Sequence, residues 1–259
     1  SSIQQLDLSF CWHISDLTPL AQLSCLQQLN LTRCQQISDL TPLAQLSRLQ
    51  QLGLSGCEQI SDLTPLTQLS RLQRLELNEC WQISDLTPLA QLSSLQQLDL
   101  SGCGQVSDLT LLTQLSRLQQ LKLNKCWQIS DLTPLAQLSC LQQLDLSKCE
   151  QISDLTPLAQ LSSLQQLDLR GSGIPLSDLA ALPSFPKLKK LACSAPFPCL
   201  PGHSPIHQLI YLQELQAETL LDAPQELAYV LSRDRNSGAA CLDRILAWQQ
   251  DIVATGEAD

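Results

Sequence analysis

The sequence contains no methionine, neither at its first position nor inside the chain. It also has no apolar run that approaches the roughly 18 residues of a membrane-spanning helix, and no signal peptide is recognisable. The chain begins as SSIQQLDLSFC, already inside a pattern that recurs further on. We therefore expect no membrane span, and we expect the native chain to continue N-terminally into further repeats or an NTPase or signalling domain.

Positive charge and catalytic motifs are also scarce. The 15 basic residues are outnumbered by 25 acidic ones, which gives a net charge of −10. Proteins that bind duplex nucleic acid or anionic membranes show a basic face, so neither partner is expected. The sequence contains no P-loop, no Gly-rich phosphate loop, no G-x-S-x-G and no H-E-x-x-H. We expect a chain that is not an enzyme and needs no cofactor.

What the sequence does contain is one unit repeated every 23 residues. Each unit reads L-x-x-L-x-L-x-x-C-x-x-I-S-D-L-T-P-L-x-Q-L-S, with small changes from copy to copy. The L-x-L segment alternates with period two, which predicts a short strand with its leucines facing inward. The Thr-Pro pair predicts an N-cap followed by one 3₁₀ or short α turn. One unit cannot bury its own apolar side, whereas stacked units can, so the pattern predicts an α/β solenoid.

This pattern resembles the leucine-rich repeat family over residues 3–172, specifically the bacterial internalin-like type with Cys at the usual Asn position. The resemblance implies a right-handed superhelix, with a parallel sheet on the concave side and short 3₁₀ or α turns on the convex side. It also implies a role in protein binding. We expect regular repeats over residues 1–172, irregular repeats over 173–219 and a C-terminal helical cap over 220–259.

Two columns of identical residues run through the repeats. The cysteines pack as small apolar side chains in this interpretation, with metal binding or disulfides as the alternative. Free buried thiols fit a reducing cytoplasm. The aspartates cap nearby backbone N–H groups, with calcium binding as the alternative. The cysteine column is Cys11, Cys34, Cys57, Cys80, Cys103, Cys126 and Cys149, and the aspartate column is Asp16, Asp39, Asp62, Asp85, Asp108, Asp131, Asp154 and Asp178.

Three columns vary between copies: the outward strand position, the residue before each Cys and the residue after it. Core packing does not require Trp after the Cys, because Gln, Glu and Gly also occur there. Aromatic side chains beside separated charges favour recognition of a protein partner on the concave face and adjacent rim. Alternatively, each Trp shields its own coil or stacks on a sugar. The predicted binding residues are Trp12, Arg74, Glu76, Glu79, Trp81, Asp99, Lys122, Lys125, Trp127, Asp145 and Lys148.

The C-terminal part contains one candidate metal site and one further family resemblance. Cys193, Cys199, His203 and His207 have residue types that suit tetrahedral zinc, but a packed, irregular Pro-rich loop explains them without a metal. The tail is similar to segments that follow the repeats in NACHT- or NB-ARC-type ATPases and Roco-type GTPases of bacteria. This suggests the sensor or scaffold arm of a cytoplasmic signalling protein. The alternatives are a structural spacer without a ligand and a ubiquitin-ligase fragment that uses Cys241.

Overall fold

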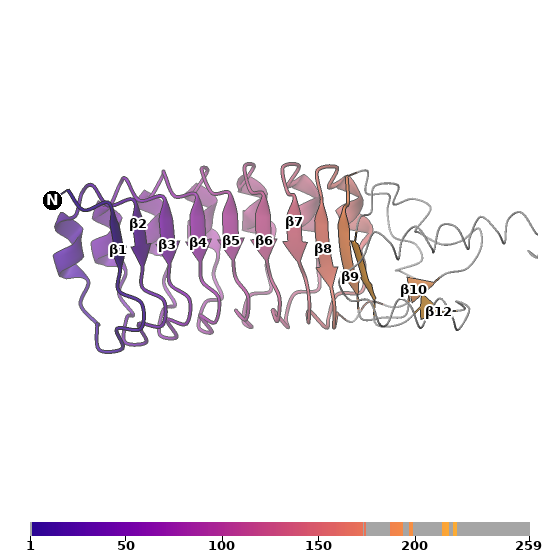
Figure 1. Cartoon of the computed structure of the whole chain (residues 1–259), viewed down its shortest axis with the longest axis horizontal. Helices are drawn as coiled ribbons and strands as arrows, with labels where there is room; N and C mark the ends of the chain where they lie inside the picture. Colours follow the sequence, from indigo (N-terminus) through magenta and orange to yellow (C-terminus); the bar gives the residue numbers. More distant parts are fainter. Residues whose placement is uncertain are drawn as a thin grey trace, which may run out of the picture.

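The structure is a computed structural model that describes residues 2–172, 174 and 187–193, and three short strands beyond them. One strand from each coil joins a single sheet of ten strands (Figure 1). These strands are β1 (Gln5–Asp7), β2 (Gln28–Asn30), β3 (Gln51–Gly53), β4 (Arg74–Glu76), β5 (Gln97–Asp99), β6 (Gln120–Lys122), β7 (Gln143–Asp145), β8 (Gln166–Leu169), β9 (Lys190–Cys193) and β11 (Glu214–Ala217). The strands β10 (Phe197–Pro198) and β12 (Leu220–Leu221) pair separately.

The register of the sheet repeats the period of the sequence. From β1 to β8, every residue pairs in parallel with the residue 23 positions later, as Leu6 does with Leu29. At β9 the offset becomes 24, because Gln166 pairs with Lys190. The extra residue in the connection after β8 is therefore absorbed outside the sheet, and equivalent side chains remain in straight columns.

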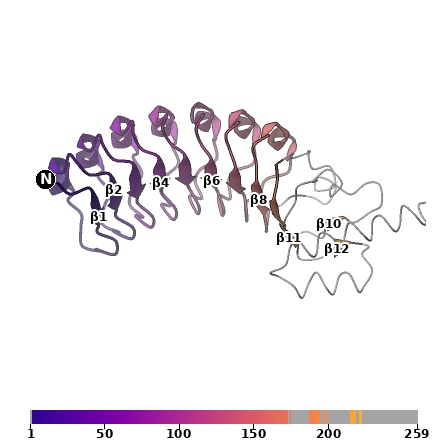
Figure 2. The ribbon, with the colours of Figure 1, turned by 45° about the horizontal axis from the view of Figure 1, so that its top comes forward.

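The coils form an arc, with the strands on its inner side and short 3₁₀ helices on its outer side (Figure 2). Every helix in the described coils is too short to span a bilayer. This arrangement confirms the predicted solenoid with its parallel concave sheet. The helices are η1 (Thr18–Gln22), η2 (Thr41–Gln45), η3 (Thr64–Gln68), η4 (Thr87–Gln91), η5 (Thr110–Gln114), η6 (Thr133–Gln137) and η7 (Thr156–Gln160).

The start of each 3₁₀ helix differs from the prediction that Thr is the N-cap. In η2 the N-cap is Leu40, and Thr41 and Pro42 are the first helical residues. The Thr41 backbone N–H donates to Asp39 Oδ1 at 2.8 Å, and the other six described aspartates of the column make the same bond at 2.7–2.8 Å. This confirms the capping role of the aspartates as far as Asp154, whereas Asp178 lies outside the described residues.

The core is a continuous stack of Leu, Ile and Cys side chains. From the second coil to the seventh these side chains are almost fully buried, and each buried leucine contributes roughly 1.5–3 kcal/mol by its transfer from water. The first coil is different, because Leu6, Leu8 and Leu20 are only partly buried. In the described chain no coil covers that end of the stack.

The cysteine column serves this core, as predicted. From Cys34 to Cys149, each thiol donates to the carbonyl oxygen of a leucine in the preceding coil at 3.0–3.2 Å. All cysteines from Cys11 to Cys149 are unbridged. Burial raises the pKa of Cys103 to about 12, so this thiol stays protonated and keeps its donor.

Candidate functional site

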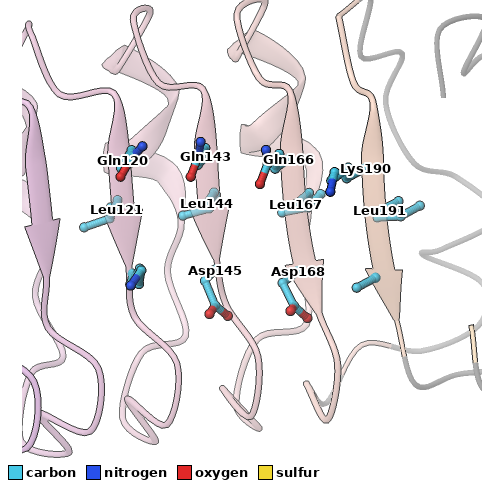
Figure 3. A pocket seen from close by; sticks show the side chains of 12 residues that line it. Gln120, Leu121, Gln143, Leu144, Asp145, Gln166, Leu167, Asp168, Lys190 and Leu191 are labelled. Carbon is cyan, nitrogen blue, oxygen red and sulfur yellow. The ribbon is translucent and has the colours of Figure 1, made fainter. Parts of the chain in front are cut away.

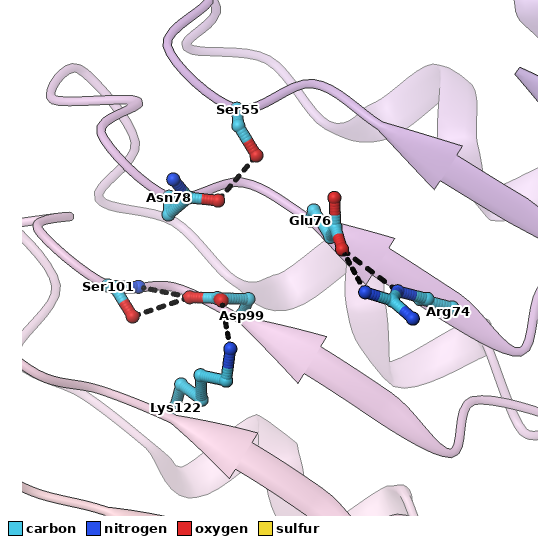
Figure 4. A network of polar contacts seen from close by, with 7 residues as sticks. All are labelled: Ser55, Arg74, Glu76, Asn78, Asp99, Ser101 and Lys122. Atoms are coloured by element: carbon cyan, nitrogen blue, oxygen red, sulfur yellow. Dashed lines mark hydrogen bonds and ion pairs between the residues drawn. The ribbon is translucent and has the colours of Figure 1, made fainter. Parts of the chain in front are cut away.

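The outward strand column lies on the concave face as a row of mostly charged side chains. Glu76, Asp99, Lys122 and Asp145 occupy equivalent positions in β4 to β7. Lys122 Nζ lies 3.1 Å from Asp99 Oδ2, and Asp99 also accepts from the Ser101 backbone at 3.0 Å (Figure 4). Lys122 is therefore held between two acidic neighbours and is electrostatically compensated.

Arg74 and Glu76 form a second ion pair on the same face. Arg74 Nε and Nη2 donate to Glu76 Oε1 at 2.9 Å and 2.5 Å (Figure 4). The two residues stand two positions apart on β4, so both side chains project from the same face of the sheet. Both residues belong to the predicted site, and the structure shows that they form an ion pair with each other.

The column before each cysteine has an unexpected backbone conformation. All eight of its residues have positive φ, between 59° and 76°. Glycine adopts this left-handed region freely, whereas another residue there costs roughly 1–3 kcal/mol. The non-glycine members are Phe10, Arg33, Glu79, Lys125 and Lys148, and the glycines are Gly56, Gly102 and Gly171. The recurrence of Gly in this column was the signal in the sequence that pointed to this backbone conformation.

Two members of this column form an ion pair across an intervening coil. Arg33 Nη2 lies 3.5 Å from Glu79 Oε2, although 46 residues separate them. The arginine passes over Gly56, because a Cβ on that glycine would lie 3.1 Å from Arg33 Cγ. Arg33 was absent from the predicted site, yet it compensates Glu79.

The column after each cysteine carries three tryptophans, all of them solvent-exposed. Trp12, Trp81 and Trp127 retain 60%, 53% and 56% of their accessible surface. Trp127 lies against the preceding coil, since a Cβ on Gly104 would be 3.0 Å from its Cε3. The Trp127 ring therefore occupies part of the space over Gly104, on the coil between Trp81 and Trp127. Trp12 lies three coils before Trp81 and belongs to a different part of the rim.

A shallow hollow brings the central predicted residues together. Its lining includes Glu79, Trp81, Asp99, Lys122, Lys125 and Trp127. Gly102 forms part of the floor, and Asn78 and Asn124 add amide groups. Lys148 is the next residue after Lys125 in the positive-φ column. This hollow offers aromatic contact area next to hydrogen-bonding and charged groups, which suits recognition of a polar surface.

A second hollow lies on the concave face between β6 and β9. Asp145 and Asp168 stand side by side on β7 and β8, below a row formed by Gln120, Gln143 and Gln166 (Figure 3). Asp168 forms an ion pair with Arg170 at 2.5 Å. Asp145 belongs to the predicted site, whereas Asp168 does not.

The C-terminal predictions stay untested. The backbone of Cys193 belongs to β9, while Cys199, His203, His207 and Cys241 lie outside the described residues. The predicted cap over residues 220–259 also lies outside them, apart from β12. No metal-binding group of Cys, His, Asp or Glu occurs among the residues that the structure describes.

Comparison with known proteins supports the repeat architecture. The family model described as "Leucine Rich repeats (2 copies)" matches residues 1–45, 70–114 and 116–160, together more than half of the chain. No curated protein matches the chain significantly.

Solved structures of repeat proteins superpose on this chain. An internalin (inlF) from Listeria monocytogenes strain 4b F2365 does so with a TM-score of 0.67 and 27% identity, over 86% of this chain and 62% of the internalin. An internalin C2 (inlC2) of the same strain gives 0.51 and 39%, over 60% of this chain and 66% of the internalin. This chain therefore covers less than two thirds of either internalin. The leucine-rich repeat domain of the type III effector XCV3220 (XopL) shares the fold at 23% identity and a TM-score of 0.60, over 74% of this chain and 69% of that domain.

Proposed function

Because this chain belongs to the leucine-rich repeat family, we propose that it is a recognition module that binds a protein partner through its concave face and the adjacent rim. The observation that carries the proposal is the exposure of Trp81 and Trp127 beside the charged hollow. Exposed aromatic rings next to fixed charges provide contact area and orientation, the two properties of a binding hot spot. The uniform leucine core needs neither tryptophan.

The proposed wider role is the sensor or scaffold arm of a larger bacterial signalling protein. A module of stacked coils with one variable surface suits such an arm, because the core stays constant while the surface changes. We further propose a cytoplasmic location, because a column of unbridged, buried thiols suits a reducing compartment. The chain itself performs no catalysis in this proposal.

The test is capture of partners from a lysate of the source cells, with the parent chain and a W81A/W127A/K122E variant as baits. Partners retained by the parent and lost by the variant support the proposed surface. A W12A variant tests the remaining rim tryptophan of the predicted site by itself, since Trp12 has the same position in its repeat and similar exposure but does not line the hollow. Partners that W12A keeps and the triple variant loses are bound at the hollow. Each bait must melt at the temperature of the parent.

Two results would contradict the proposal. A partner that all baits capture equally well would place its binding outside the hollow. No captured partner for any bait would favour the structural spacer, which has the same core but no ligand.

A further inference from the structure

For most residues of the positive-φ column, the structure of the protein itself explains which residue stands there. Three coils carry glycine, which fits this backbone without strain. Arg33 and Glu79 do not fit it, but they pair with each other over Gly56. For these two residues, the ion pair within the protein offsets part of the backbone cost.

Neither explanation applies to Lys125 and Lys148, which are not glycine and form no ion pair with a described residue. Both have a φ near 60°, and both are exposed on adjacent coils. Their backbone positions are about 5 Å apart, the spacing of neighbouring strands, so two like charges stand next to each other. Among the described residues, neither lysine has an ion pair or a side-chain hydrogen bond. Two strained and mutually repelling cations, with no ion partner in the described part of an acidic protein, indicate an interaction made with another molecule.

Trp127 completes this arrangement. It follows Lys125 by two residues, it is more than half exposed, and its ring is supported by Gly104. A ring held against glycine is a rigid, flat surface that loses little conformational freedom on binding. Lys125 and Trp127 line the hollow, and Lys148 stands on the next coil, where its stem leans over Gly171. We call these three residues the anchor.

We propose that Lys125, Lys148 and Trp127 bind a polypeptide segment that presents a carboxylate side chain next to an apolar or aromatic side chain. The carboxylate lies between the two lysines, and its apolar neighbour packs on the Trp127 ring. This inference rests on the proposed function, because it specifies the chemistry of the protein partner at that surface.

The charges around the anchor favour a single carboxylate over a nucleic acid. Glu150 has the same position as Trp127 in the next repeat. Asp145 lines the hollow on its concave side. A chain of phosphates would have to pass these carboxylates, whereas one acidic side chain reaches the lysines alone. The net charge of −10 opposes a polyanion in the same way.

The test uses a displayed library of random 12-residue peptides, selected in parallel on the parent chain, on K125E/K148E and on R71E/R117E. The R71E/R117E control makes the same change in net charge, but Arg71 and Arg117 precede their strands, whereas the two lysines follow theirs. We expect the parent and this control to enrich peptides with Asp or Glu next to an apolar residue. These peptides should bind K125E/K148E about tenfold more weakly or worse.

A K125G/K148G variant separates a binding role from a structural one. Glycine relieves the backbone strain, so this variant should melt at a higher temperature than the parent and still lose the acidic peptides. Lysines with a structural role would instead give a variant that melts lower.

The outcomes distinguish the two proposals. If the parent enriches peptides that bind K125E/K148E equally well, the anchor is refuted while protein recognition stands. If the parent enriches no peptide, the proposed function is contradicted at this surface and the anchor with it. A labelled 20-residue oligouridylate that binds the parent more tightly than the peptides, and loses binding in K125E/K148E, would replace the carboxylate with a nucleic acid.

Discussion

Arg33 and Glu79 are joined across a full coil of the solenoid, and Gly56 lies between them in the same column. Arg33 Nη2 is 3.5 Å from Glu79 Oε2, with both side chains about half exposed. An exposed ion pair of this kind contributes little on its own, roughly 0–1 kcal/mol. The glycine beneath it matters more, because its φ of 68° is one that other residues adopt only with strain.

The first prediction concerns this glycine. G56A should lower the free energy of unfolding by about 1–2 kcal/mol, because alanine must adopt a positive φ and its Cβ would meet Arg33 Cγ at 3.1 Å. Urea denaturation followed by circular dichroism measures the change. R33A/G56A removes the contact and keeps the strain, so most of the loss should remain. Full recovery in this double variant would show that the contact, and not the backbone, is responsible.

The second prediction concerns Gly104, whose backbone does not require glycine. G104A should leave the melting temperature close to that of the parent but displace the Trp127 ring, since the new Cβ would lie 3.0 Å from Cε3. Fluorescence of a W12F/W81F/W248F background, in which Trp127 is the one remaining tryptophan, should report a changed Trp127 environment when G104A is added. G53A is a useful comparison, because its Cβ would meet Asn30 and Thr32 instead of an aromatic ring. An unchanged Trp127 spectrum in G104A would refute the contact.

The repeated part of this protein could be predicted well from the sequence, because apolar residues that recur at a fixed spacing are the ones that the fold buries. Leu29 and Leu31 face inward in every equivalent copy, and a column of identical residues has to lie at one place in the coil. The role of Asp39 followed from the known tendency of aspartate to bond nearby N–H groups. The position of the cap did not follow, because Leu40 has no side-chain group that marks an N-cap.

The candidate site could be predicted only in part, because its side chains contact residues of other coils and the sequence does not show these contacts. Arg33 meets Glu79 only because an intervening glycine leaves room, and Trp127 covers Gly104 only because that coil has no side chain there. Both facts concern residues one or two repeats apart. A list of column members shows which side chains are exposed, but not which of them neutralise each other.

The third prediction concerns thiol reactivity. The thiolate is the reactive form, so burial of Cys103 together with a pKa of about 12 should prevent modification at pH 8. The exposed Cys140 should react quickly with iodoacetamide in the folded protein. Mass spectrometry of the modified peptides separates the two sites, and addition of urea should make Cys103 react as well. Equal labelling of both cysteines in the folded state would contradict the buried column.

The fourth prediction is the alkaline limit of stability. The pKa of Cys103 rises from an ordinary value of 9.0 to about 12 on folding, so the unfolded chain loses this proton first. Stability from the protonated thiol is therefore complete below pH 9 and is lost as the pH rises toward 12, by about 1.4 kcal/mol per pH unit for each such thiol. Denaturation curves between pH 8 and pH 11 should show a steeper loss for the parent than for C103A. Equal slopes would show that this thiol does not contribute.

The fifth prediction separates the geometry of the aspartate cap from its charge. Hydrogen bonds from the side chain and backbone of Thr64 lower the pKa of Asp62 from its ordinary value of 3.8, so its contribution is present above pH 3.8 and is lost as the pH falls below it. D62A should melt at a lower temperature than the parent at pH 7. D62N retains an Oδ1 acceptor and should melt above D62A at pH 7, and its melting temperature should fall less between pH 5 and pH 3 than that of the parent. If D62N and D62A melted together at pH 7, the stabilisation would come from the charge of Asp62 and not from the bond to the Thr64 N–H.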